Sequence, residues 1–277
     1  MRVVPLEVLA EGGTYTEGVD LTSAELLAML QRGVRVTTSQ PAPAAFAAAY
    51  AQAAADGARE VVSVHLSGEL SGTVQAARLA ANDAPVPVHV VDSRLAAMAL
   101  GFTVLEVARF ATTALPDETA GGRSWRRPHP SLPGGEAVAA HAATAAAGAR
   151  AWFLVDSLDH LRRGGRLSTT SAAIGTVLGL RPLLTLSDGA VVVAERVRTR
   201  RAARERLEAV AAAFASERGD VRVAVHHLGE PEVAQRFVED LGRRIGSHAV
   251  ELVACEASAV VAAHVGPGVL AVVVADA

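Results

Sequence analysis

The sequence predicts an α/β protein, and three observations support that prediction. In the first half of the 277-residue chain, short runs of β-branched residues alternate with alanine-rich helical stretches. This order is typical of a parallel sheet whose strands are joined by crossover helices. The second half alternates in the same way around Asp188-Gly189, a strong hairpin-turn signal. Hydrophobic residues make up 51% of the chain and charged residues 20%, so the chain can bury a sizeable core.

The elements of the first half follow from capping residues and apolar periodicity. Residues 22–33 predict a helix, because Thr22 and Ser23 stand at its start and Gly33 at its end. A hydroxyl-rich loop with two prolines then leads into a helix that ends near Gly57. The other expected elements are strands at 2–10, 60–66 and 86–93 and helices at 72–81 and 96–111.

The middle of the chain changes character before the second module begins. Residues 116–135 crowd proline, glycine and arginine together without an apolar period, which predicts an exposed loop or, alternatively, a partner-docking surface. The elements expected after it are a strand from 149, helices at 157–164 and 169–179, a hairpin at 183–198, a long amphipathic helix, a strand at 221–229, another helix, and strands at 249–257 and 264–276.

The charged residues exclude several classes of function. The formal net charge is −3, so neither nucleic acid nor an anionic membrane is an expected partner. All 26 basic residues are arginine, because the sequence contains no lysine. A Walker-type lysine, a Schiff-base lysine and a lysine general base are therefore all excluded.

Cysteine, histidine and hydropathy patterns point to a soluble protein without a metal. The one cysteine, Cys255, lies in an apolar run and is expected to be a packed core thiol. Nine scattered histidines do not support a metal site. The apolar stretch at the N-terminus is too short for a signal peptide, and no apolar run elsewhere is long enough to span a membrane. We therefore expect a cytoplasmic protein without stable membrane insertion.

The stretch "HLSGELSGTVQAARLAA" (65–81) runs from a strand through a small hydroxyl-rich loop into a helix. Ser71 lacks the surroundings of a nucleophile elbow, which argues against a serine hydrolase. Helix capping accounts for a serine here, and so does an anion site built from hydroxyls and free backbone N–H groups. The sequence alone does not distinguish helix capping from an anion site at Ser71.

Other side chains fit such an anion site. Thr38 and Ser39 belong to a run of three hydroxyl residues before a proline-opened helix, and capping explains only one of them. Arg166 follows a Gly-Gly turn, and Arg198 ends the hairpin. His264 precedes a Gly-Pro-Gly turn, where it is either a satisfied core residue or a donor aimed at a carboxylate. Solvated surface charge is the ordinary alternative for both arginines.

Together, these segments resemble the DegV family of bacterial fatty-acid-binding proteins, the lipid-carrying subunits of fatty acid kinase. The resemblance spans nearly the whole chain and rests on "VPLEV", "TTSQPAPAAF", "LSGELSGTVQAA", "VVDSRLAAMALG", "VDSLDHLRRGGRLSTTSAAIGTVLGLRPLL", "DGAVVVAERVRTRRAA" and "AAHVGPG". It implies two α/β domains, 1–148 with a parallel sheet and 149–277 with a mixed sheet. Family members begin with an additional strand carrying a Thr-Asp-Ser-type motif, which this chain is expected to lack.

The resemblance also implies a function and a set of site residues. A long-chain fatty acid such as palmitate or oleate would lie in a buried tunnel between the domains, and a separate ATP-dependent fatty acid kinase would convert it to an acyl-phosphate. The chain itself would be no enzyme and would need no cofactor. The resemblance implies that Thr38, Ser71, Gly72 and His264 bind the carboxylate. It implies that Ser39, Ser67, Arg166 and Arg198 lie near the head group or interact with the kinase.

Two other functions remain compatible with the sequence. One is an α/β enzyme that uses the hydroxyl-and-arginine pocket on a small phosphorylated or carboxylated substrate. The other is a degenerate family member that serves only as an interaction module. A long dry tunnel favours the carrier, whereas an open polar cleft favours the enzyme.

Overall fold

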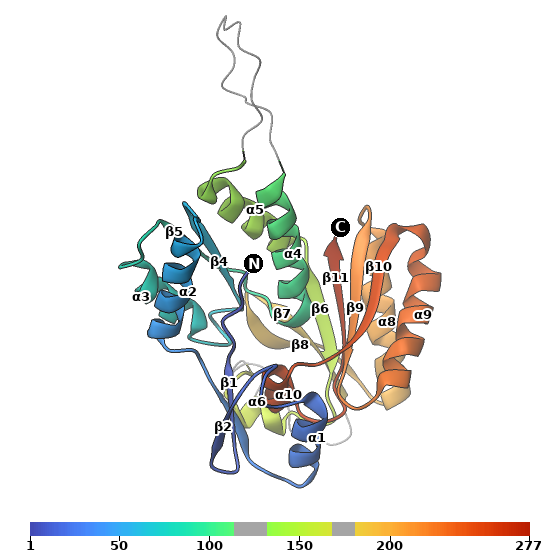
Figure 1. Ribbon diagram of the computed structural model, residues 1–277. Helices are drawn as coiled ribbons and strands as arrows, with labels where there is room; N and C mark the ends of the chain where they lie inside the picture. The colour runs from blue at the N-terminus through green and yellow to red at the C-terminus, as the bar shows by residue number, and fades with distance from the viewer. Residues whose placement is uncertain (114–131, 168–180) are drawn as a thin grey trace, which may run out of the picture.

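The computed structural model describes residues 1–113, 132–167 and 181–277. In this part of the chain the strands form three sheets, with the strand orders β10-β9-β11-β6-β7-β8, β4-β5 and β2-β1-β3 (Figure 1). Residues 116–131 of the expected loop and the helix expected at 169–179 lie outside the described residues. The α/β fold class is confirmed.

The largest sheet belongs to the second half of the chain and is mixed, as predicted. β9 and β10 pair in parallel, whereas β9–β11, β11–β6, β6–β7 and β7–β8 pair antiparallel. The expected hairpin is present, with Asp188 and Gly189 joining β7 to β8. The strands are β6 (Arg150–Leu154), β7 (Arg181–Ser187), β8 (Ala190–Val197), β9 (Val221–His227), β10 (Ala249–Glu256) and β11 (Leu270–Asp276).

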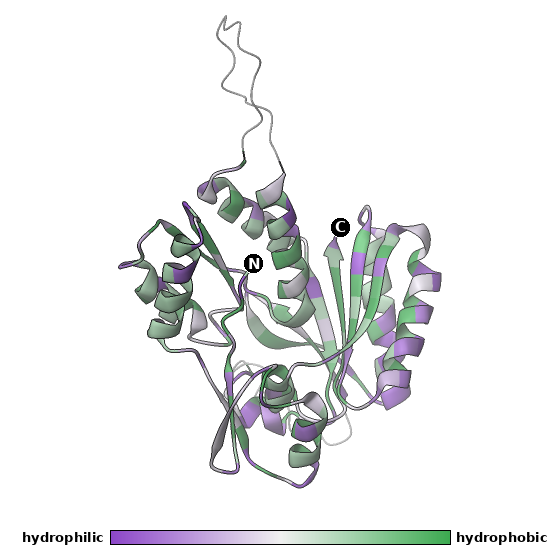
Figure 2. Ribbon diagram, in the orientation of Figure 1, coloured by the Kyte–Doolittle hydropathy of each residue, from purple (hydrophilic) through white to green (hydrophobic). Residues whose placement is uncertain are grey.

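Helices cover both faces of this sheet, because its central strands β9 and β11 are buried along most of their length, and β11 is almost entirely hydrophobic (Figure 2). Val272 and Val274 of β11 pack in the core beneath α8 (Arg200–Ser216) and α9 (Pro231–Ile245). Val273 faces the opposite way and packs beneath α4. Helix α4 spans Ala97–Thr112, and a 3₁₀ turn, η1 (Gly246–His248), leads from α9 into β10.

The parallel pair expected in the first half is formed by β4 (Val61–His65) and β5 (Val88–Asp92). One face packs against α2 and α3, and the other against α4 and α5. These helices span Pro43–Ala55 (α2), Thr73–Ala81 (α3) and Gly135–Ala147 (α5). In Figure 1 the layers follow one another from α2 and α3 on the left to α8 and α9 on the right.

The third sheet departs from the expected pattern. β1 (Glu7–Ala10) pairs antiparallel with both β2 (Gly13–Thr16) and β3 (Val36–Ser39). A parallel arrangement throughout the first half is therefore wrong, because β1 turns back after four residues. Glu11 and Gly12 make this turn, and both have positive φ, as in the tight turns that suit twisted hairpins.

A further hydrophobic cluster joins the beginning of the chain to its end. Helix α1 (Ser23–Gln31) starts after Thr22, as its sequence predicts, and Thr22 and Glu25 form a reciprocal capping box. It packs with α6 (Asp159–Arg163) and α10 (Ala259–Val265) in a core that contains Leu26 and Val260. Helix α1 and part of the first sheet thus pack against elements of the second half, and a domain division at residue 148 stays a prediction.

The description of the helices bears on membrane insertion in one way. Among the residues that the structure describes, every helix is too short or too polar to cross a bilayer.

Candidate functional site

The end of β3 places Thr38 against the last turn of α10. Because side chains alternate along a strand, Thr37 is exposed and Thr38 is half-buried. Thr38 Oγ1 lies 2.7 Å from His264 Nε2 across a sequence separation of 226 residues. The expectation that these hydroxyls open the next helix is wrong, because α2 begins after Ala42, without a side-chain cap.

His264 is neutral at physiological pH. Burial, with a smaller contribution from the charge of Arg166, lowers the pKa of His264 from 6.5 to about 4. A neutral imidazole carries one N–H group, and when Nε2 carries it, His264 donates to Thr38 Oγ1. The Thr38 hydroxyl proton is then free to be donated to an anion.

The turn after α6 brings an arginine to this histidine. A β-carbon at Gly164 would lie 2.6 Å from His264 Nδ1, so only glycine leaves room for the imidazole. Gly165 has φ of +69°, which reverses the chain and points Arg166 back over the turn. Arg166 Nε donates to the Leu70 carbonyl at 2.9 Å, and its guanidinium also donates to the Gly164 carbonyl.

Arg166 thereby reaches the loop that carries Ser71. Ser71 is half-buried, and its Oγ lies 2.6 Å from Thr73 Oγ1 and accepts from the Thr73 N–H at 3.3 Å. The cap residue of α3 is Gly72, which offers no side chain, so Ser71 is not the helix cap that its sequence context suggested. Thr38 thus contacts His264, and the backbone of Gly164 and Leu70 connects His264, through Arg166, to the loop that carries Ser71.

A second contact closes the site from the β3 side. The amide of Gln40 lies against Gly72, where any β-carbon would collide with it. Ser39 Oγ donates to the Gln40 carbonyl at 3.1 Å, which places Ser39 beside this contact. Gln40 was missed in the sequence, although it stands next to the hydroxyl run at 37–39.

Two further side chains frame the site and also escaped the sequence reasoning. The ring of His160 packs against Gly266 in the turn that follows His264. Asp92, at the end of β5, accepts from the backbone N–H of Gly68 at 3.2 Å and of Arg94 at 2.9 Å. Asp92 thus ties together the loops that follow β4 and β5.

Ser67 and Arg198, the two remaining predicted residues, are not bonded to Thr38 or His264 in the described part of the chain. Ser67 is fully buried, and its Oγ donates to the Gly189 carbonyl at 2.8 Å. Arg198 is exposed just after β8, and within the described part of the chain it makes no ion pair. Neither residue contacts Thr38 or His264 through any hydrogen bond of the described residues, so their roles stay predictions.

The polar groups around Thr38, His264 and Gly72 are hydroxyls, a neutral imidazole, an amide and one guanidinium, whereas the Asp92 carboxylate accepts from the backbone N–H groups of Gly68 and Arg94. Such a set suits a small anion, because hydroxyl and N–H donors stabilise negative charge and Arg166 adds a positive charge nearby. In residues 1–113, 132–167 and 181–277, no cluster of three His, Cys, Asp or Glu side chains is placed to hold a metal ion.

Cys255 does not form a reactive centre with its histidine neighbour. Its Sγ lies 3.3 Å from His226 Nδ1, but burial raises the pKa of Cys255 to about 11 and lowers that of His226 to about 4. Both groups are therefore neutral near pH 7, and the thiolate that a nucleophile needs is disfavoured. His226 Nε2 accepts from the Met98 N–H at 3.1 Å.

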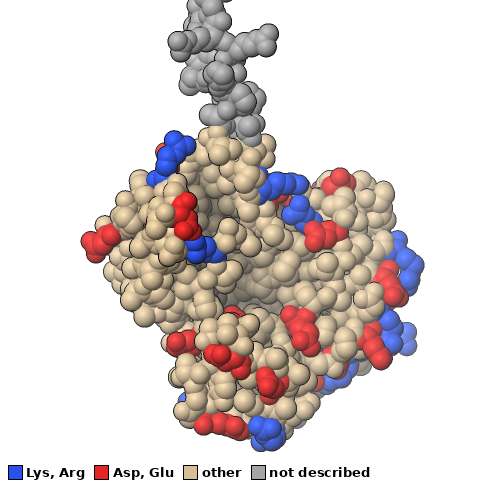
Figure 3. All heavy atoms as spheres, in the orientation of Figure 1, with Lys and Arg blue, Asp and Glu red and all other residues tan. Residues whose placement is uncertain are grey.

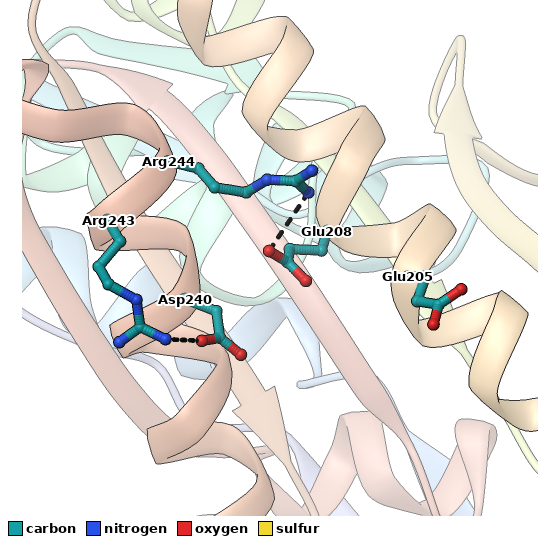
Figure 4. Close-up of a pocket in the computed structure, with 5 residues that line it drawn as sticks. All are labelled: Glu205, Glu208, Asp240, Arg243 and Arg244. Carbon is teal, nitrogen blue, oxygen red and sulfur yellow. Dashed lines mark hydrogen bonds and ion pairs between the residues drawn. The ribbon is translucent and has the colours of Figure 1, made fainter.

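A charged groove of about 510 Å³ lies elsewhere, between α8 and α9 (Figure 4). Its ion pairs are internal, with Arg244 binding Glu208 at 3.2 Å and Arg243 binding Asp240. A groove of this kind does not suit an acyl chain. By contrast, the face drawn in Figure 3 is hollowed near its centre, where uncharged residues predominate and charged side chains gather at the margins.

Comparison with known proteins gives one consistent result. The model of the DegV family, described as uncharacterised, matches residues 1–115 and 135–277. A DegV domain-containing protein of Streptomyces coelicolor is 43% identical over 276 residues, covering 100% of this chain and 91% of the relative. The structure of DegV from Bacillus subtilis, described as a fatty acid binding protein, has a TM-score of 0.83 at 29% identity and covers 99% of this chain and 91% of its own. A structure on fatty acid binding by a DegV family protein of Thermus thermophilus has a TM-score of 0.81 at 34% identity, over 100% and 92% of the two chains.

Proposed function

Because this chain belongs to the DegV family, we propose that it binds one long-chain fatty acid and holds the carboxylate with Thr38, Ser71, Gly72 and His264. The observation that carries the proposal is the 2.7 Å contact between Thr38 and His264, which Arg166 connects to the loop of Ser71 through the Gly164 and Leu70 carbonyls. The two relatives from Bacillus subtilis and Thermus thermophilus, described as fatty-acid-binding, share this fold over 99% or more of the chain.

The chemistry of the site suits a carrier. Neutral donors hold a carboxylate without neutralising it, so the oxygen stays available for reaction with an electrophile. Arg166 donates to the Leu70 and Gly164 carbonyls, which supports a position of its positive charge near the proposed head group. A charge in that place would stabilise the additional negative charge of an acyl-phosphate. The acyl chain would lie in a buried tunnel, because each methylene kept from water contributes about 0.8 kcal/mol.

We therefore place this chain as a non-catalytic subunit that presents the fatty acid carboxyl to a separate ATP-dependent kinase. The absence of lysine from the sequence agrees with this division, since the chain has no Walker-type lysine with which to bind ATP phosphates. Arg198 is exposed after β8, where a partner protein could reach it. We assign Ser39 and Ser67 to the surroundings of the head group, because Ser39 bonds to the Gln40 carbonyl and Ser67 begins the loop that carries Ser71.

Replacing Ser71 tests the assignment of the carboxylate site. We expect Ser71→Ala to weaken binding of palmitate and oleate about tenfold or more, because one hydrogen bond to a charged group is lost. Isothermal titration of delipidated protein measures the effect. Ser216→Ala is the matched control, since Ser216 is exposed at the end of α8 and bonds only to the Ala213 carbonyl. Equal affinities of the two variants would remove Ser71 from the site.

The kinase step has a separate test. We expect Arg198→Ala to leave oleate affinity within twofold of the wild type and to lower kinase-dependent phosphorylation of the bound lipid at least fivefold. The reason is that an exposed guanidinium contributes to a partner interface and not to the lipid pocket. Arg236→Ala, an exposed arginine on α9, is the control. Unchanged phosphorylation in Arg198→Ala would exclude Arg198 from the kinase interface.

A further inference from the structure

The tip of the β7–β8 hairpin is inserted into the loop region that carries Ser71. Ser67 begins this loop and is 0% exposed. Its hydroxyl donates to the Gly189 carbonyl at 2.8 Å and accepts from the Glu69 N–H at 3.2 Å. The hydroxyl is thus fully used by protein groups, and the hydrogen bond connects the two halves of the chain.

Gly189 fits this place for two physical reasons. Its φ is +84°, and Asp188 before it also has a positive φ of 50°, so the two residues form a tight reversal. A β-carbon at Gly189 would collide with Ser67 Oγ and would lie 3.3 Å from Arg94 Cβ. Only glycine at position 189 therefore allows the hairpin tip to approach the loop this closely. The neighbouring ion pair between Arg94 and Asp188 is largely exposed and adds little.

The backbone of Ser67 carries this contact on to the head-group site. The Ser67 carbonyl accepts from the N–H of Leu70 at 3.0 Å and of Ser71 at 3.1 Å. On the other side, Arg166 donates to the Leu70 carbonyl. The turn from 67 to 71 is therefore held at its start by the hairpin tip and near its end by Arg166.

We propose that Ser67 and Gly189 are positioning residues that fix the Ser71 hydroxyl for the head group through the turn at 67–71. This inference rests on the proposed function for its ligand, a long-chain carboxylate. It assigns Ser67 a role through Ser71 and not through direct contact with the lipid, and it makes the hairpin tip part of the binding apparatus.

The chain contains a matched control for the test. Gly12 occupies the same position of the β1–β2 hairpin turn, with φ of +77° after a positive φ at Glu11, but a β-carbon there would meet nothing within 4 Å. Gly189→Ala and Gly12→Ala therefore share the backbone strain, and only Gly189→Ala adds the collision with Ser67. We expect Gly189→Ala to bind oleate about tenfold more weakly than Gly12→Ala in isothermal titration.

A second variant and a second measurement keep the proposal testable if Gly189→Ala does not fold. Ser67→Ala removes the hydroxyl without new bulk, and we expect a similar loss of oleate affinity if Gly189→Ala fails to fold. Amide hydrogen exchange in intact protein should be faster at Leu70 and Ser71 in both variants than in the wild type and Gly12→Ala. In the double variant the two losses should combine less than additively, because the collision with Ser67 Oγ disappears.

The outcomes separate this inference from the proposed function. If the wild type binds oleate and the variants match Gly12→Ala in both affinity and exchange, the positioning role is wrong. If the wild type fails to bind oleate, the proposed function is wrong, and exchange alone then decides the inference. Faster exchange at Leu70 and Ser71 supports it, and unchanged exchange overturns it.

Discussion

Lowering the pH from about 7 to about 4 is expected to destabilise this protein severely. Burial is the main cause of a lowered pKa in three histidines, each falling from 6.5 to about 4: His65, His226 and His264. In the unfolded chain these imidazoles take up protons near pH 6.5, whereas in the folded chain they stay neutral until about pH 4. Their neutral forms therefore favour the folded state above pH 6.5, and this stability is lost as the pH falls towards 4.

The expected size follows from the shifts. One histidine whose pKa falls from 6.5 to about 4 contributes about 3 kcal/mol at most. Three such groups together approach the whole free energy of unfolding of an ordinary domain, about 5–15 kcal/mol. The surroundings of His65 also fit a neutral ring, since its Nε2 lies 2.7 Å from Ser63 Oγ and Tyr50 donates to the same hydroxyl.

Urea unfolding at a series of pH values measures this effect. We expect the free energy of unfolding to fall steadily between pH 6.5 and 4, and to fall less steeply in His264→Gln. The exposed His248, replaced in His248→Gln, is the control. A free energy of unfolding that stays level over this interval would contradict the buried, neutral state of the three imidazoles.

Removing two hydroxyls together is expected to reduce lipid affinity more than a hundredfold. The variant combines Thr38→Val with Ser71→Ala, which retain the approximate size of each side chain. A hydrogen bond to a charged group contributes about 1.5–3 kcal/mol, so two of them exceed the ~2.7 kcal/mol that a hundredfold change requires. Thr38→Val also leaves His264 Nε2 without its partner at 2.7 Å.

The matched control uses the alternation of β3. Thr37→Val changes an exposed threonine on the neighbouring position of the same strand, and Ser216→Ala supplies the second hydroxyl loss. Both double variants should unfold cooperatively, which circular dichroism checks before titration with palmitate and oleate. An affinity of the Thr38→Val/Ser71→Ala variant within threefold of that control would exclude the hydroxyl site for the carboxylate.

Local signals in the sequence were sufficient for much of the fold. Thr22 caps the helix whose start it was expected to mark, and Asp188-Gly189 makes the expected hairpin turn. Strands β2 and β3 and the helices α5 and α10 were not expected, and the residues of β3 had been assigned to a hydroxyl-rich loop. The Glu11-Gly12 turn lies next to a second glycine and was hard to separate from a loop, and α5 is so rich in alanine that it lacks a clear apolar period.

The candidate site could be predicted as a set of residues but not as an arrangement. Thr38 and His264 are 226 residues apart, so their contact depends on how β3 packs against α10. The contact between Gln40 and Gly72 and the bond from Ser67 to Gly189 likewise join distant segments. Side-chain type indicated an anion site, whereas only tertiary packing distinguishes a hydroxyl that faces the site from one that holds the chain together.

The most direct test of fatty acid binding is the lipid content of the purified protein. Denaturing extraction followed by mass spectrometry should release about one long-chain fatty acid per chain from the wild type, and much less from the Thr38→Val/Ser71→Ala variant. Protein that carries no fatty acid, and that also fails to take up added palmitate or oleate, would contradict the proposed function.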